Sequence, residues 1–280
     1  MPKPEVILFY NPRAGRFRLH KVLHIQHELE HLLGSCRAIS DIHELQEVKQ
    51  AHIVIAGGDG TVHTAINHAD LHTNTFSVIA MGSGNDFVCN FPVHSLRDLC
   101  RNILAEKTTQ VDLLQVNDTR AAVLVGVGFD AFVSDKARKN RIKIPSLKYL
   151  IPVARYMFFY KGIQMHISGK DLQYSGRVFM LSCGNGYRAG GGFRLFPKAS
   201  VSDGKMDVLL IEPPTFWQKL KYAGLVNFGK HLNLNIVKYI QTDSITVRLD
   251  NPDFFNTDGD VYTAAEMQIT ILPGVLKLIQ

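Results

Sequence analysis

A strand, a glycine loop and a helix follow one another at residues 53–68, which is the order in which α/β proteins build an anion site. The loop, residues 57–61, reads Gly-Gly-Asp-Gly-Thr. Its glycines would let the backbone approach a phosphate, and the helix N-terminus would supply free N–H groups and the positive end of its dipole. The carboxylate of Asp59 repels phosphate unless a metal ion or a proton lies between them, so the loop indicates chemistry as well as binding. A plain glycine turn with Asp59 as a capping residue is the alternative.

Two more strand-like runs end in small, polar loops. Residues 6–10 lead into Asn-Pro-Arg-Ala-Gly, and residues 76–80 lead into Gly-Ser-Gly-Asn-Asp-Phe at 82–87. The carboxyl ends of strands converge at one edge of an open parallel sheet, so the three loops predict one shared ligand site. The other elements expected here are a helix at 62–68, a helix at 17–33, a strand at 36–39 and a helix at 45–50.

From about residue 109 the pattern changes to short runs of alternating polar and apolar residues. This pattern predicts a β-rich domain, built as a sandwich or a curled antiparallel sheet, with helical segments at 134–160 and 215–231. We place the domain boundary near residue 115, with an α/β nucleotide-binding domain at 1–115 and a β-rich domain at 116–272. The strands expected are 111–116, 121–127, 164–167, 177–182, 206–211, 236–241, 245–249, 267–272 and 275–279.

The composition is that of a folded domain with anionic partners. Of the 280 residues 46% are hydrophobic and 20% charged, and the formal net charge is +6. We expect no signal peptide and no membrane span, because the longest apolar candidate, 147–159, contains Lys148, Pro152 and Arg155. The four cysteines form no CxxC pair and no disulfide framework, which predicts a cytoplasmic protein.

Two enzyme motifs in the chain are outweighed by simpler explanations. His27-Glu28-Leu29-Glu30-His31 matches the zinc-protease pattern, but at 100° per residue its histidines fall opposite the apolar stripe and should face solvent. Residues 126–131 match G-x-G-x-x-A, yet no acidic residue follows about 20 positions later, so a strand-to-helix turn is favoured over a dinucleotide site. No P-loop and no G-x-S-x-G motif occurs.

Two acidic turns in the second half of the chain remain ambiguous. Asp203-Gly204 follows the glycine-rich stretch 184–192 and is either a plain turn or a ligand for a hard cation. Asp258-Gly259-Asp260 is either a hairpin turn or a pair of carboxylates with a base or metal role.

Residues 134–160 are rich in cationic and apolar side chains, an arrangement that can lie on an anionic bilayer. An ordinary basic helix over the core explains the segment equally well, and no stacking motif supports nucleic acid as a partner. The cationic residues are Lys136, Arg138, Lys139, Arg141, Lys143 and Lys148.

With these residues in hand, the chain resembles the diacylglycerol kinase/sphingosine kinase superfamily of lipid kinases, and its small bacterial members most of all. Four blocks carry the resemblance over nearly the whole chain, and the closing Asp258-Gly259 fits as well. Gly-Gly-Asp-Gly-Thr alone is shared with NAD kinases and 6-phosphofructokinases, whereas the other blocks are typical of lipid kinases. The blocks are residues 11–15, residues 57–61 with Asn67, residues 82–87, and residues 184–208 with Pro197 and Asp203-Gly204.

The resemblance implies a kinase with an NAD kinase/phosphofructokinase-like α/β domain, a β-rich domain for the lipid, and ATP and Mg²⁺ between them. The proton acceptor maps to Asp260, where the family usually has Glu, and Asp59 is the second catalytic candidate. A structural magnesium maps to Asp203 with the carbonyls of Ser200 and Lys205. The last strand, about 273–280, would return to the N-terminal domain. The implied nucleotide contacts are Asn11, Pro12, Arg13, Ala14, Gly15, Ser40, Gly57, Gly58, Asp59, Gly60, Thr61, Val62, Ser83 and Asn85.

Three functions follow in order of preference. The first is an ATP- and Mg²⁺-dependent lipid kinase acting on diacylglycerol or a related lipid at an anionic membrane surface. It would attach peripherally, and the resemblance allows a homodimer, because related proteins often dimerise. The second is an NAD kinase-like enzyme, which is disfavoured because Asn67 is followed by His68 where such enzymes usually have Glu. The third is a nucleotide-binding regulatory protein without turnover, supported only by the Asp at position 260.

Overall fold

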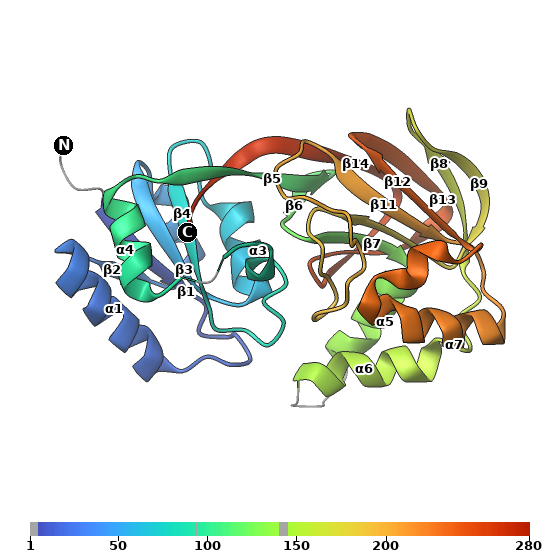
Figure 1. Ribbon diagram of the computed structural model, residues 1–280, viewed down its shortest axis with the longest axis horizontal. Helices are drawn as coiled ribbons and strands as arrows, with labels where there is room; N and C mark the ends of the chain where they lie inside the picture. Colours follow the sequence, from blue (N-terminus) through green and yellow to red (C-terminus); the bar gives the residue numbers. More distant parts are fainter. Residues whose placement is uncertain (1–4, 93, 140–144) are drawn as a thin grey trace.

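The computed structural model describes residues 5–92, 94–139 and 145–280 and shows two halves joined by long strands (Figure 1). The N-terminal half contains a parallel sheet in the order β4-β3-β1-β2. Its central strand β3 is buried along its whole length, as expected of a continuous apolar run covered on both faces. Its elements are β1 (Glu5–Tyr10), α1 (Leu19–Leu33), β2 (Arg37–Ile39), α2 (Ile42–Glu47), β3 (Ala51–Gly57), α3 (Asp59–His68), β4 (Thr75–Ala80) and α4 (Leu96–Leu104).

Helices cover both faces of this sheet. One apolar cluster contains Val22 and Leu29 of α1 with Ile103 of α4, and a second contains Leu45 of α2 with Ile66 of α3. The crossover helices therefore bury the two faces of the sheet and leave its carboxyl-terminal edge to the loops.

The C-terminal half is a strongly bent antiparallel sheet with accompanying helices, so the expected fold class is confirmed. Two long strands, β13 and β14, pair with each other, and their apolar residues meet those of β7, β10 and β11 in one core. The elements are β5 (Thr108–Val116), β6 (Thr119–Ala121), β7 (Leu124–Gly128), α5 (Phe129–Lys139), α6 (Pro145–Tyr156), β8 (Ile163–Ser168), β9 (Gln173–Val178), β10 (Met180–Gly184), β11 (Met206–Ile211), α7 (Phe216–Leu225), β12 (Val237–Thr242), β13 (Ser244–Thr257) and β14 (Asp260–Ile279).

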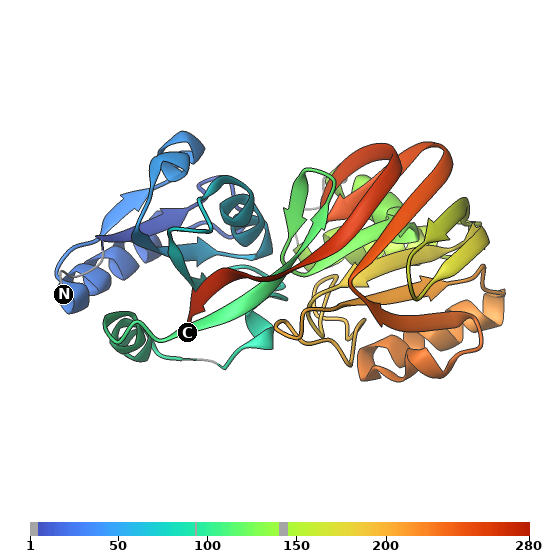
Figure 2. The same ribbon diagram turned by 90° about the horizontal axis from the view of Figure 1, so that it is seen from above.

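One sheet runs through both halves, because β14 pairs with strands of each. Its first part pairs with β13, and near its end Leu278 lies beside Phe76 of β4 in parallel. The hydroxyl of Ser77 donates a hydrogen bond to the carbonyl of Ile279 at 2.9 Å. Strand β5 accompanies β14 in antiparallel register, and Figure 2 shows this two-stranded ribbon passing between the halves.

Several element boundaries differ from the expected ones. The helix expected at 45–50 is α2, which begins at Ile42 because the Asp41 carboxylate accepts the N–H of His43 at 2.7 Å and so caps the helix. The single helix expected at 134–160 is two helices, α5 and α6. Helix α4 was not anticipated, and the strands expected at 267–272 and 275–279 are one strand whose register shifts between Leu272 and Leu276.

Candidate active site

The second and third glycine loops touch each other through their backbones. A Cβ placed on Gly58 would lie 2.7 Å from the Cα of Gly82, and a Cβ on Gly82 would lie 2.6 Å from the Cα of Gly58. Neither position can hold a side chain without moving a loop. The Asn85 side chain fixes the second loop, since its Oδ1 accepts the N–H of Gly82 at 2.9 Å. Ser83 lies exposed at the tip of this loop.

The loop at residues 11–15 lies at the same edge of the sheet. It turns on Asn11, whose carbonyl accepts the N–H of Ala14 at 3.1 Å and whose side chain accepts the N–H of Arg13 at 2.9 Å. The guanidinium of Arg16 then donates to the carbonyl of Gly82 at 3.4 Å. All three loops are therefore linked by direct contacts, with Pro12 and Gly15 exposed on the first of them. Ser40 follows β2, which is parallel to β1, and it is exposed at this edge as well.

Helix α3 begins at Asp59, the acidic residue of the glycine loop. The N–H groups of Thr61 and Val62 both donate to the carbonyl of Gly58, so these two residues serve the first helical turn, and their side chains are buried. Gly60 has open space at its Cβ position. The helix N-terminus, with Gly57 and Gly58 before it, thus carries the positive end of the dipole toward the loops.

Two carboxylates meet beside Gly84. A Cβ on that glycine would lie 3.0 Å from the Asp59 Oδ2 and 3.8 Å from the Asp86 Oδ2. Asp59 accepts the N–H of Phe87 at 3.1 Å, whereas Asp86 accepts the N–H of Gly191 at 2.7 Å. The second of these bonds joins the two halves, because Gly191 belongs to the glycine loop after β10.

Both carboxylates hold their protons more tightly than usual. Burial raises the pKa of Asp86 to about 6, the Gly191 N–H opposes this change, and the negative charge of Asp59 adds to it. Burial also raises the pKa of Asp59, to which the charge of Asp258 contributes. The Oδ1 of Asp86 is buried and has no hydrogen-bond partner among the described residues. Two close carboxylates, that of Asp86 buried and that of Asp59 half-buried, with a free oxygen have the chemistry of a site for a hard cation.

A second acidic group lies at the tip of the β13–β14 hairpin. The carboxylate of Asp258 accepts the N–H groups of Ala122 at 2.7 Å, Val123 at 3.0 Å and Leu124 at 2.9 Å. His63 of α3 lies against it, with Nδ1 3.4 Å from the Asp258 Oδ2. The hairpin explanation of Asp258-Gly259 is confirmed, since both residues have positive φ, and Asp258 also anchors the start of β7.

His63 connects this anchor to Asp260. Its Nε2 lies 3.7 Å from the Asp260 Oδ2, and the Asp260 side chain is 57% exposed whereas that of His63 is 6% exposed. Burial disfavours a charged imidazole, but the hydrogen bond and the charge of Asp258, together with Asp260, outweigh it and raise the pKa of His63. The exposed carboxylate of Asp260 therefore has a buried imidazole directly behind it.

The Asp203 turn is held by a different carboxylate. Asp112 is buried in β5, and its two oxygens accept the N–H groups of Gly204 and Gly274, each at 2.7 Å. Asp203 is exposed, and its Oδ1 accepts the N–H of Lys205 at 3.1 Å. A carboxylate beside backbone carbonyls is a suitable donor set for Mg²⁺, although no cluster of three or more His, Cys, Asp or Glu side chains is found in the described part of the chain.

The structure resolves the competing motifs. His24, His27 and His31 are exposed on α1 while Leu29 is buried, as the face argument predicted. Residues 126–131 are a strand-to-helix turn, with Gly128 at φ +86° between β7 and α5. In the basic segment, Lys139 pairs with Asp135 at 2.8 Å, and Arg141, Lys143 and the side chain of Lys148 lie outside the described residues.

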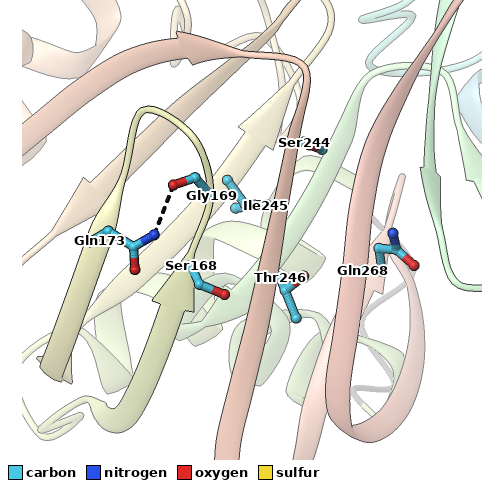
Figure 3. Close-up of a pocket in the computed structure, with 7 residues that line it drawn as sticks. All are labelled: Ser168, Gly169, Gln173, Ser244, Ile245, Thr246 and Gln268. Carbon is cyan, nitrogen blue, oxygen red and sulfur yellow. Dashed lines mark hydrogen bonds between the residues drawn. The ribbon is translucent and has the colours of Figure 1, made fainter.

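A separate hollow of about 330 Å³ lies on the C-terminal half, away from the glycine loops (Figure 3). It is lined mainly by polar residues of β8, β9, β13 and β14, and the Gln173 amide donates to the Gly169 carbonyl at 2.9 Å within it. None of the predicted site residues lines it. The lining residues are Ser168, Gly169, Gln173, Ser244, Ile245, Thr246 and Gln268.

Four residues of the described site were not among the predicted site residues: His63, Asp86, Asp112 and Asp258. Asp86 stands inside a motif and could have been chosen from its acidity, whereas Asp258 was named only as part of an ambiguous acidic turn. Asp112 is the one charged residue of β5 and stands between the apolar Val111 and Leu113, which is a signal of a buried anchor. His63 has no sequence signal, because its partners are 195 and 197 positions away.

Comparisons with known proteins agree with the two-part fold. Residues 5–116 match the family model for the diacylglycerol kinase catalytic domain, and residues 123–280 match that for the YegS C-terminal NAD kinase beta sandwich-like domain. Two proteins named "Probable lipid kinase YegS-like" are similar over most of their length. The one from Pectobacterium atrosepticum is 25% identical over 84% of this chain and 80% of its own, and the one from Xanthomonas oryzae pv. oryzae is 28% identical over 81% and 77%.

Solved structures share the fold. A diacylglycerol kinase from Bacillus anthracis aligns with a TM-score of 0.79 at 22% identity, covering 100% of this chain and 98% of that one. An NAD kinase from Archaeoglobus fulgidus, solved in complex with ATP, aligns with a TM-score of 0.54 at 13% identity, covering 99% and 93%. Among the described residues, no helix has the length and apolar character needed to cross a membrane.

Proposed function

The chain belongs to the YegS-like, diacylglycerol kinase-related family of lipid kinases, and from this premise we propose that it transfers the γ-phosphoryl group of ATP to the hydroxyl of diacylglycerol or a related lipid, with Mg²⁺. The observation that carries the proposal is the meeting of Asp59 and Asp86 with the Gly191 loop. Carboxylates, glycine loops and a helix N-terminus converge there from both halves, which is the arrangement that phosphoryl transfer requires.

The glycine loops would hold the nucleotide. Residues 11–15, Gly57 to Gly60 and Ser83 surround the start of α3, and their backbone N–H groups and the helix dipole favour the phosphates of ATP. Asn85 would act by fixing its loop, because its side chain already bonds the backbone of Gly82. Positioning and electrostatic stabilisation are the main contributions of a protein to this reaction.

Asp59 and Asp86 are the residues that would hold the catalytic cation. Their raised pKa values and the unpartnered Asp86 oxygen would be relieved by a divalent ion. Mg²⁺, when bound, supplies charge neutralisation on the transferred phosphoryl group. A second, structural Mg²⁺ is proposed at Asp203 with the carbonyls of Ser200 and Lys205, on the turn that Asp112 holds.

Asp260 would accept the proton of the lipid hydroxyl. Its carboxylate is exposed beside α3, and His63 would position it from behind. The family usually has Glu at this position, and the Asp260 side chain is shorter. The His63 imidazole would compensate by lying beside the Asp260 carboxylate. This arrangement supports an active kinase in preference to a regulatory protein that has no turnover.

Phosphate transfer from labelled Mg-ATP to acceptors in mixed micelles tests the proposal. The panel contains diacylglycerol, monoacylglycerol, ceramide, sphingosine, phosphatidylglycerol and undecaprenol, with soluble NAD alongside, and an Asp59→Asn preparation is the control for contaminating kinases. Label in diacylglycerol or a related lipid is the expected result. Label in NAD alone would move the protein to the NAD kinases, and ATP binding without any labelled acceptor would favour a regulatory protein.

A further inference from the structure

An exposed aromatic surface lies on the C-terminal half, outside the kinase site. Phe159 is 77% exposed and Trp217 76%, and Phe216 and Leu220 are also exposed. We name these residues, together with Phe158, the aromatic face. They come from α7 and from the segment that follows α6, which lie together at the lower edge of the C-terminal half in Figure 1. Exposed clusters of large apolar side chains mark interaction sites in folded proteins.

The aromatic face is held in place by specific contacts. The Phe158 and Phe216 rings lie 5.0 Å apart, and Trp217 packs edge-on against Phe216 at 5.4 Å. The ammonium group of Lys219 donates to the carbonyls of Phe158 at 3.4 Å and Tyr160 at 3.3 Å, which ties the two segments together. The rings are thus preorganised on a fixed frame, so little conformational entropy is lost when the face is covered.

A capping box fixes the start of α7 at the same place. The hydroxyl of Thr215 accepts the N–H of Gln218 at 3.4 Å, and the Gln218 side chain accepts the N–H of Thr215 at 2.8 Å. The first turn of the helix therefore presents Phe216 and Trp217 in a defined direction.

The segments that carry the face contain no negative charge. The sequence has no Asp or Glu at residues 136–170 or at residues 213–242, whereas the first stretch contains several Lys and Arg and the second contains four Lys. Arg155 of α6, Lys161 of the segment that follows it and Lys221 of α7 are exposed. A partner that covers the rings must accept these cations, and an anionic partner gains from them.

A second copy of the chain is a poor occupant, because a symmetric contact would bring the same cations against one another. An anionic bilayer fits both properties: its phosphates face the Lys and Arg side chains, while aromatic rings prefer the boundary between headgroups and acyl chains. We propose that the aromatic face docks the protein on an anionic phospholipid bilayer. The inference extends the proposed function, in which the acceptor is a membrane lipid, by naming the surface that reaches it.

The chain has one tryptophan, and it lies in this face, so its fluorescence reports docking directly. We would add vesicles of phosphatidylglycerol and phosphatidylcholine, or of phosphatidylcholine alone, and record the emission maximum of Trp217 and its quenching by brominated acyl chains. The anionic vesicles should shift the emission to shorter wavelength and allow quenching. With neutral vesicles, binding measured by the emission shift and the quenching should be at least tenfold weaker. With anionic vesicles, 0.5 M NaCl should weaken binding.

Variants with the tryptophan intact test the face itself. Phe159→Ser and Phe216→Ser should each weaken vesicle binding about tenfold, whereas Leu23→Ser, which removes an apolar side chain 53% exposed on α1, should leave it unchanged. Vesicle binding with unchanged Trp217 emission, an equal loss in Leu23→Ser, or no binding at all would overturn the proposal. An emission shift that follows protein concentration without vesicles, with dimers in sedimentation velocity, would assign the face to self-association instead.

Kinase assays separate this proposal from the proposed function. Phe159→Ser should phosphorylate a short-chain, water-soluble diacylglycerol at the wild-type rate and lose most activity on the same head group in vesicles. If the protein inserts Trp217 into vesicles but phosphorylates no acceptor, the docking proposal stands and the proposed function is wrong. A Phe159→Ser variant equally active on both forms would contradict docking through this face.

Discussion

The half-buried Asp59 is the residue on which turnover should depend most. Asp59→Asn preserves the size and the hydrogen bond from Phe87 but removes the charge that a phosphate-bound cation needs. We expect phosphate transfer to fall by about two to three orders of magnitude with an unchanged circular dichroism spectrum. A rate near wild type would remove Asp59 from the mechanism.

Asp260 should matter through its basicity. Asp260→Asn removes the proton acceptor and should lower kcat by about a hundredfold or more, with a smaller effect on the KM for ATP. Asp260→Glu keeps the carboxylate and should retain more activity than the amide, although it crowds His63. Steady-state kinetics on both variants check this, and equal losses in the two would indicate a steric role.

Asp86 makes stability depend on pH in the metal-free protein. Its pKa is raised from 3.8 to about 6 on folding, so the folded state favours the protonated form. The resulting stabilisation is complete below about pH 3.8 and is lost as the pH rises through about 6. In EDTA at pH 7.5, Asp86→Asn should therefore raise the free energy of unfolding by up to about 3 kcal/mol, and the gain should vanish near pH 4.

The same variant should respond differently to magnesium. Mg²⁺ should raise the melting temperature of the wild type, because an ion that binds the folded state stabilises it, and should raise that of Asp86→Asn much less. Differential scanning fluorimetry with and without EDTA measures both effects. A wild type that does not respond to Mg²⁺ would count against a cation between Asp59 and Asp86.

Among the elements, the contact between the two glycine loops predicts a paired result. Gly58→Ala would place its Cβ 2.7 Å from the Gly82 Cα, so a loop must move and the protein should lose about 1–3 kcal/mol of stability. Gly60→Ala, two residues later, meets nothing within 4 Å and should cost little. Chemical denaturation compares the two, and equal losses would show that the loop contact is not what requires glycine.

The sequence predicts those elements whose signals are local. Strand, loop and helix in direct succession at residues 53–68 identify the start of α3, because the apolar run and the glycines stand side by side. The start of α2 was missed because a capping Asp41 outweighs the apolar periodicity. The division into α5 and α6 was missed because the basic and apolar composition continues across it, although Pro145, the first residue of α6, is a typical helix start.

The site was predictable only where its residues share a motif. The glycine loops and Asp59 follow from spacing, whereas the joining of Asp86 to Gly191 requires the chain to fold back over 105 residues. Likewise His63 meets Asp258 and Asp260 only because the β13–β14 hairpin ends against α3. Such pairings depend on tertiary structure, and a single sequence read by itself contains no trace of them.

The molecule as a whole should unfold as one unit. Strands β5 and β14 pair with each other and contribute apolar residues to the cores of both halves. The Asp112 carboxylate of β5 also accepts hydrogen bonds from the N–H groups of Gly204 and Gly274. Calorimetry should therefore show a single transition with equal calorimetric and van't Hoff enthalpies. Two resolved transitions would mean that the ribbon uncouples before either half unfolds.

The return of β14 to β4 also orders events during synthesis. Phe76 leaves the ribosome 202 residues before its neighbour Leu278, which at about 5–20 residues per second is roughly 10–40 s. For that time β4 has an unpaired edge, and the glycine loops at the ends of β3 and β4 lack their final support. A nascent chain should therefore acquire its affinity for nucleotide late, when the strand that also belongs to the other half has arrived.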